Sequence, residues 1–150
     1  MPTHNPTTGK PTPKPTTGSP TTGAPTNLEF NLALGKPTQL SNGADGSVAV
    51  DGNTNGDYAA GSVAVGVTWI NISLPRNAVI NRIKVFNRSD CCMTNLNGFN
   101  ALVFNEAYAV VGYQTFTGFE PFFGEVTFEP ASVGNLLQIQ TPVQLMVAEI

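Results

Sequence analysis

The sequence predicts an all-β protein: an antiparallel β-sandwich, or jelly roll, preceded by an extended tail rich in proline and threonine. Short runs rich in Val, Ile, Phe and Tyr alternate with turn clusters such as SNGADGS, DGNTNGD and NLNGF. No segment shows a sustained helical period. The composition changes at Asn27, which divides the chain into a stalk, residues 1–26, and a β-sandwich domain, residues 27–150.

The stalk has a composition that cannot form a core. Seven Pro, nine Thr and three Gly fill 19 of its 26 positions, so it buries too little surface to offset its own ordering entropy. Proline favours an extended polyproline II path, and dense threonine beside proline is typical of O-glycosylated stalks. We therefore predict O-glycans on stalk threonines, among them Thr7, Thr8, Thr16, Thr17, Thr21 and Thr22.

Seven strand candidates follow in the domain. They are residues 67–74, 79–86, 99–104, 106–116, 124–129, 135–140 and 143–150. In the first, apolar Ile70 and Ile72 alternate with Asn71 and Ser73, which is the pattern of a half-buried strand. Seven short strands separated by turns favour a sandwich over other all-β architectures. Asn71-Ile-Ser73 also fits the N-glycosylation acceptor pattern, and Asn71 has the polar parity of its strand, so we predict a glycan there.

The charge distribution limits the partners. The stalk carries +2 from Lys10 and Lys14, whereas five basic and ten acidic residues give the domain −5. An acidic domain without a basic cluster argues against nucleic acid, whose binding depends on phosphate neutralisation. No apolar run approaches the roughly 18 residues of a membrane span. The sequence thus predicts neither a nucleic-acid partner nor a membrane span.

The domain lacks the histidine that serine-based catalysis needs, and its acids Glu106, Glu120, Glu125 and Glu129 are interpreted as solvated surface rather than as a glycosidase pair. The single histidine, His4, lies in the stalk, so no histidine can act as a base beside a serine. The sequence contains no phosphate-binding glycine loop and no zinc-ligand spacing. We predict that the protein is not an enzyme.

Cys91 and Cys92 are adjacent. Metal and redox motifs normally place residues between their cysteines, so those interpretations are weak. The pair is either two reduced thiols without a role or a disulfide between neighbours, which would form a rigid loop. A persistent disulfide belongs to an oxidising, extracellular setting, and the stalk composition independently indicates the same location. We predict a secreted protein.

Three segments resemble the F-type lectins, or fucolectins, which are jelly-roll relatives of the discoidin-like carbohydrate-binding domains. They are NLALGKPT at 31–38, AVDGN at 49–53 and NRSDCC at 87–92. The resemblance extends from about Asn31 to Ile150, and the NRSDCC string is its most specific part. It implies a jelly roll with a vicinal Cys91–Cys92 disulfide.

The resemblance also implies a structural calcium ion. The matching side chains are Asp51, Asn53, Ser62 and Glu149, and backbone carbonyls near Val48 and Ala148 would complete the shell. Six to eight oxygen ligands suit this ion. Asp-Gly-Asn by itself would more often form a plain turn.

The family's fucose pocket is the second implied site, and it is incomplete here. The family uses a histidine, an Arg-x-Asp pair and a second basic residue five positions later, with the vicinal disulfide packed on the sugar. Arg88 and Asp90 match, with Cys91 and Cys92 beside them, but Val65 and Asn95 occupy the histidine and second basic positions. Losing two donors weakens recognition of hydroxyls steeply. We therefore predict weak fucose binding and a structural Arg88–Asp90 ion pair.

Two functions follow from these features. The first is an extracellular assembly module, a subunit of a fibre or matrix whose N-terminal tail packs on copies of the same chain. A 26-residue polyproline II tail reaches about 80 Å, farther than one small domain is wide. The alternative is a calcium-containing lectin with a degenerate fucose-type pocket, displayed on a flexible stalk and binding glycans.

Overall fold

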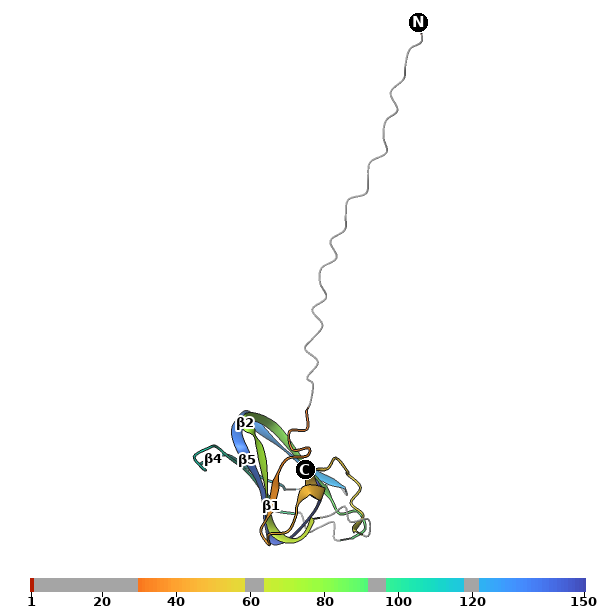
Figure 1. The fold of residues 1–150 in the computed structure, drawn as a ribbon, viewed down its shortest axis with the longest axis vertical. Helices are drawn as coiled ribbons and strands as arrows, with labels where there is room; N and C mark the ends of the chain where they lie inside the picture. Colours follow the sequence, from red (N-terminus) through yellow and green to blue (C-terminus); the bar gives the residue numbers. More distant parts are fainter. Residues whose placement is uncertain (2–29, 59–63, 92–96, 118–121) are drawn as a thin grey trace.

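The computed structural model describes residue 1 and residues 30–58, 64–91, 97–117 and 122–150, so the stalk lies almost wholly outside the described residues. Its elements are β1 (Thr38–Leu40), the 3-10 helix η1 (Ser47–Val50), β2 (Ala64–Asn87), β3 (Asn100–Phe104), β4 (Val110–Thr115) and β5 (Phe123–Glu149). The strands wrap around a common core, as Figure 1 shows. The predicted jelly-roll β-sandwich is confirmed.

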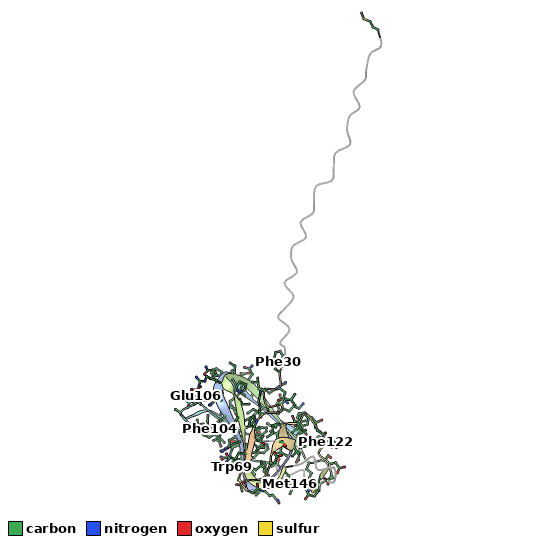
Figure 2. All side chains as sticks on the ribbon, viewed as in Figure 1. Phe30, Trp69, Phe104, Glu106, Phe122 and Met146 are labelled. Carbon is green, nitrogen blue, oxygen red and sulfur yellow. The ribbon has the colours of Figure 1, made fainter. Side chains whose placement is uncertain are left out.

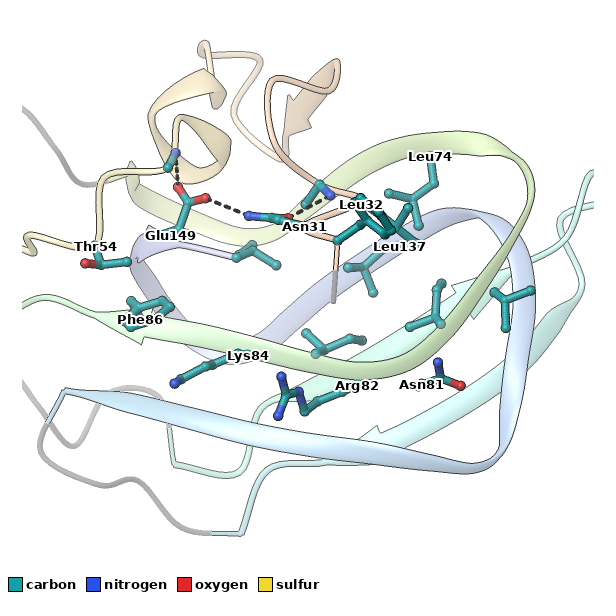
Figure 3. A pocket seen from close by; sticks show the side chains of 17 residues that line it. Asn31, Leu32, Thr54, Leu74, Asn81, Arg82, Lys84, Phe86, Leu137 and Glu149 are labelled. Carbon is teal, nitrogen blue, oxygen red and sulfur yellow. Dashed lines mark hydrogen bonds between the residues drawn. The ribbon is translucent and has the colours of Figure 1, made fainter. Parts of the chain in front are cut away.

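The strands pair in the order β1-β2-β5-β3-β4. β2 and β5 are long strands that fold back on themselves (Figure 3). Within each paired run the β5 partner numbers fall as the β2 numbers rise, from Trp69 with Gln140 to Ser73 with Leu136, which is antiparallel geometry. Asn77, with φ of 55°, lies where β2 reverses. The candidates 67–74 and 79–86 are therefore two arms of one bent strand.

The structure differs from the predicted strands in two places. The candidate 106–116 begins later, at Val110, because the Asn105 side chain accepts hydrogen bonds from the backbone N–H groups of Ala107 and Ala109, at 2.9 and 3.0 Å, and holds a turn there. β1 was not predicted. It has only three residues and is held by antiparallel pairing with β2, a long-range contact that local sequence does not reveal.

The core lies between the folded arms of β2 and β5. Ile70 and Ile72 are fully buried, as their alternation predicts. Phe99 and Phe116 stack with their ring centroids 4.2 Å apart. By contrast, Phe122 is exposed. Within the described part of the chain, no helix is long and apolar enough to cross a membrane.

Candidate functional site

Arg88 follows the end of β2 and is held from three sides. Its Nη2 donates to Asp90 Oδ2 at 2.7 Å and its Nε donates to Asp90 Oδ1, so the guanidinium and carboxylate form a two-point pair. The guanidinium carbon lies 4.3 Å from the centroid of the Tyr58 ring. Nη1 also contacts Met146 Sδ at 3.9 Å. The predicted ion pair is present, and an aromatic ring supports it.

This pair stays ionised near neutral pH. The hydrogen bonds from Arg88 hold the pKa of Asp90 below its usual value, and the same bonds raise the pKa of Arg88. The Arg88 side chain is only 15% exposed while Asp90 is 37% exposed. The structure therefore holds the Arg88 guanidinium in a fixed orientation within an ion pair of no net charge.

The backbone beneath Arg88 is positioned by a close approach of Gly56. A Cβ atom at Gly56 would lie 2.2 Å from the Asn87 carbonyl oxygen and 2.6 Å from the Ser89 nitrogen. The Ser89 N–H donates to the Gly56 carbonyl at 2.9 Å. Asn87 is 2% exposed, and its Oδ1 accepts from the Arg88 N–H at 2.8 Å. Only glycine fits at position 56. The sequence DGNTNGD around it is typical of an ordinary turn and gives no sign of this close contact.

The remaining pocket predictions are placed only in part. Val65 is the register partner of Met146 in the β2–β5 pairing, so the backbone brings this position close to Arg88. Cys91 is disulfide-bonded, but Cys92 and Asn95 lie outside the described residues, and the Cys91–Cys92 pairing stays a prediction. The sequence did not indicate Tyr58 or Met146, because nothing local shows that either contacts Arg88.

Glu149 ends β5 and is almost fully buried, with 2% of its surface exposed. Its Oε2 accepts from the Gly52 N–H at 3.0 Å, and its Oε1 accepts from Asn31 Nδ2 at 3.4 Å (Figure 3). Burial raises the pKa of Glu149, the Gly52 bond opposes that effect, and nearby Asp51 raises the pKa further. A buried carboxylate beside a second carboxylate is an electrostatically unfavourable arrangement that a cation would relieve.

The residues around Glu149 fit a hard cation. Asp51 and Asn53 lie in one turn, in which Asp51 Oδ1 accepts from the Asn53 N–H at 2.7 Å. The Ile150 N–H donates to the Ala49 carbonyl at 2.9 Å, which brings the segment of Ala148 against η1, where Val48 lies. Ser62 lies outside the described residues. The described residues contain no group of three or more His, Cys, Asp or Glu suited to a metal, so carbonyl oxygens would have to complete the shell.

A groove of about 540 Å³ adjoins Glu149 and is shown in Figure 3. Phe30, Arg82, Lys84 and Phe86 contribute to its lining. Lys84 Nζ lies 3.9 Å from the centroid of the Phe123 ring, and Arg82 Nη1 lies 3.6 Å from Glu125 Oε2. The sequence gives no local signal for this groove, since its lining comes from distant segments.

Comparison with known proteins identifies the class. Residues 48–133 match the family described as NedA-like, galactose-binding domain, and the chain belongs to that family. The structure is also that of an F-type-lectin-like, discoidin-like domain, which confirms the resemblance seen in the sequence. No curated protein gives a significant match.

Three solved structures illustrate the similarity. The lectin domain of Lectinolysin, complexed with Lewis B antigen, is 27% identical to this chain with a TM-score of 0.70. The alignment covers 80% of this chain and 93% of the Lectinolysin domain. A fucolectin from striped bass (Morone saxatilis) serum is 25% identical with a TM-score of 0.67, covering 79% of this chain and 46% of its own. A Streptococcus pneumoniae fucose-binding module, at 23% identity and TM-score 0.70, covers 80% and 92% and supports the fold alone.

Proposed function

We propose that this protein is a carbohydrate-binding, lectin-like module without catalytic activity, and that Arg88 is the centre of its glycan site. The observation that supports this most directly is the Arg88 guanidinium, fixed by Asp90 and by the Tyr58 ring at the rim of the sandwich. The solved structures similar to this chain include a lectin domain bound to Lewis B antigen and a fucolectin. The family description, a galactose-binding domain, agrees with a sugar ligand.

The residues at the pocket positions favour a glycan larger than one fucose unit. Arg88 offers charged N–H donors to sugar hydroxyls, and Cys91 beside it offers an apolar contact. Val65 and Asn95 stand where the family has two further donors, so a single fucose would make few strong hydrogen bonds. We therefore propose that contacts with neighbouring sugars of an oligosaccharide supply the missing affinity.

We further propose that calcium stabilises the domain rather than contacting the sugar. Glu149 and Asp51, with Asn53, Ser62 and nearby carbonyls, would hold the ion. The buried Glu149 carboxylate, with its raised pKa and neutral hydrogen-bond partners, supports this placement. When bound, the ion would neutralise both carboxylates and fix the C-terminal strand to the η1 region.

A glycan array tests the proposal. The wild-type protein is expected to bind a subset of oligosaccharides, with Lewis b, galactose-terminated glycans and free fucose as reference probes. Arg88→Ala should lose that binding, while Arg82→Ala should retain it, because Arg82 is paired with Glu125 on another surface. Absence of binding to every glycan, or full binding by Arg88→Ala, would contradict the proposed site.

An assembly function is the second candidate. β4 is an edge strand, and it exposes Val110, Val111 and Tyr113, as strands that pair with another chain do. In this candidate function the protein is secreted, and its stalk packs on other copies of the same chain. The stalk lies outside the described residues. Deletion of the stalk, described in the Discussion, tests this candidate.

A further inference from the structure

One face of the sandwich is uncharged and rich in amide groups. The register of β2, β5, β3 and β4 aligns Trp69 with Gln140 and Asn100 with Thr115 in one row, and Asn71 with Gln138 and Leu102 with Tyr113 in the next. The alternate residues Ile70, Ile139 and Ala101 are buried in the core, so the first set points outward. We call the polar and aromatic residues of this outward set, among which Leu102 also lies, the amide face: Trp69, Asn71, Asn100, Tyr113, Thr115, Gln138 and Gln140.

The absence of charge on this face is a property of the strands themselves. Residues 69–73, 100–104, 110–115 and 136–140 contain no Asp, Glu, Lys or Arg, although the chain has seven basic and ten acidic residues. The ion pair between Arg76 and Glu106 lies beyond the ends of these segments. Surfaces of soluble domains normally intersperse charges of both signs, so a charge-free face of this extent indicates a neutral partner.

The polar side chains on the amide face are held in place by one another. Gln138 Nε2 donates to Asn71 Oδ1 at 2.8 Å. The Tyr113 hydroxyl donates to Asn100 Oδ1 at 2.8 Å, and the Thr115 hydroxyl donates to the same oxygen at 2.8 Å. Tyr113 is directly opposite Leu102, not Asn100, so its ring must extend along the sheet to reach that amide. Tyr113 as a whole is 55% exposed, so part of its side chain is open to solvent.

An open hollow of about 410 Å³ is lined in part by Asn100, the residue that accepts the Tyr113 hydroxyl bond. Its lining includes Trp69, Asn100 and Gln140 of the amide face, together with Thr68, Gly98 and Thr141. Aromatic, amide and hydroxyl groups thus surround one depression, and none of its lining residues is charged. In Figure 2 Trp69 lies on the side of the sandwich opposite Phe122, whose backbone carbonyl accepts from the Asn87 N–H beside Arg88. The hollow is separate from the Arg88 site.

We propose that the amide face is a second carbohydrate site that binds an extended, neutral polysaccharide chain. The rings of Trp69 and Tyr113 would stack on the apolar C–H faces of the sugars, and the amides of Asn100 and Gln140 would exchange hydrogen bonds with hydroxyls. The face offers no charge to pair with an acidic sugar. Three strand spacings separate β2 from β4, about 14 Å, so the ligand is a chain of several sugar units rather than a single sugar.

Affinity electrophoresis with bacterially produced, unglycosylated protein tests this site. Native gels containing hydroxyethylcellulose, xylan or galactomannan should retard the wild-type protein in at least one case. Trp69→Ala and Gln140→Ala should each weaken that retardation at least tenfold in apparent affinity, and Tyr113→Ala should do the same. Tyr108→Ala is the matched control, because Tyr108 is a highly exposed tyrosine at the β3–β4 turn, outside the amide face.

The outcomes separate this site from the proposed lectin site. Arg88→Ala should keep its retardation, so loss of array binding with retained retardation supports two independent sites. No retardation in any of the three gels, or retardation unchanged by both Trp69→Ala and Gln140→Ala in variants that melt like the wild type, would overturn the proposal. If these substitutions instead convert an oligomer to a monomer in light scattering, the face is a contact between copies and the proposal is wrong.

Discussion

Gly56→Ala should weaken glycan binding while leaving the sandwich folded. The added Cβ would lie 2.2 Å from the Asn87 carbonyl oxygen and 2.8 Å from Arg88 Cα, so it meets backbone on both counts. Relieving the overlap requires the two segments to separate by roughly 1 Å, and overpacking of this kind costs about 1–3 kcal/mol of stability. Displacing Arg88 should remove at least one charge-assisted hydrogen bond to the sugar, about 1.5–3 kcal/mol. Binding should then weaken roughly 10- to 150-fold.

Gly134→Ala provides the matched control. Its Cβ would lie 2.5 Å from the Phe104 carbonyl oxygen, but Gly134 pairs with Ala78 near the reversal of β2, far along the strand from Arg88. Both variants should lower the melting temperature, and only Gly56→Ala should weaken binding in calorimetry with the strongest glycan from the array. Wild-type affinity in Gly56→Ala would refute the argument that this close approach positions Arg88. Equal losses in both variants would show that the effect is general destabilisation.

Four further predictions concern stability, the disulfide and assembly. The pKa of Glu149 is raised in the folded state, so its contribution to stability is full below the unfolded-state pKa and is lost as the pH rises through the folded-state pKa. In excess chelator, the melting temperature should therefore fall over that pH range. Glu149→Gln should flatten this fall, because glutamine does not titrate. Calcium at 100 times its Kd should add about 2.7 kcal/mol, whereas identical melts with calcium and with chelator would contradict the proposed ion site. Alkylation without reductant should add no label to Cys91 or Cys92, and two labels in the intact mass would exclude their disulfide. Deleting residues 1–26 should leave a folded monomer by light scattering, and an assembly that survives this deletion would rule out the tail as the element that joins copies.

Local patterns were sufficient to predict the fold. The alternation of Ile70 and Ile72 with polar residues correctly identified a core-facing strand, because the two-residue period is a local property. Local signals did not show that β2 continues through its reversal at Asn77 or that β1 pairs with it. Both depend on register between segments far apart in sequence, which one sequence does not reveal.

The candidate sites were predictable to different degrees. Arg88 and Asp90 are two residues apart, so the sequence could place them together, and the structure joins them. The Tyr58 ring and the close approach of Gly56 come from a distant loop and were missed. Asn71 shows the reverse case: its acceptor pattern predicts a glycan, but the structure places it on the amide face with a hydrogen bond from Gln138. A glycan at Asn71 would cover that face, so peptide mass spectrometry of protein from a glycosylating host decides between the N-glycan and the amide-face site.

The central claim, a glycan site built on Arg88, is tested most directly by NMR chemical-shift mapping during titration with the strongest glycan from the array. Our proposal predicts that the largest shifts fall on the backbone amides of Arg88, Ser89 and Asp90 and on the ring of Tyr58. It also predicts that Arg88→Ala removes these shifts at the same glycan concentration. Shifts confined to residues distant from this loop, or a titration that leaves the Arg88 region unchanged while the glycan binds, would contradict it.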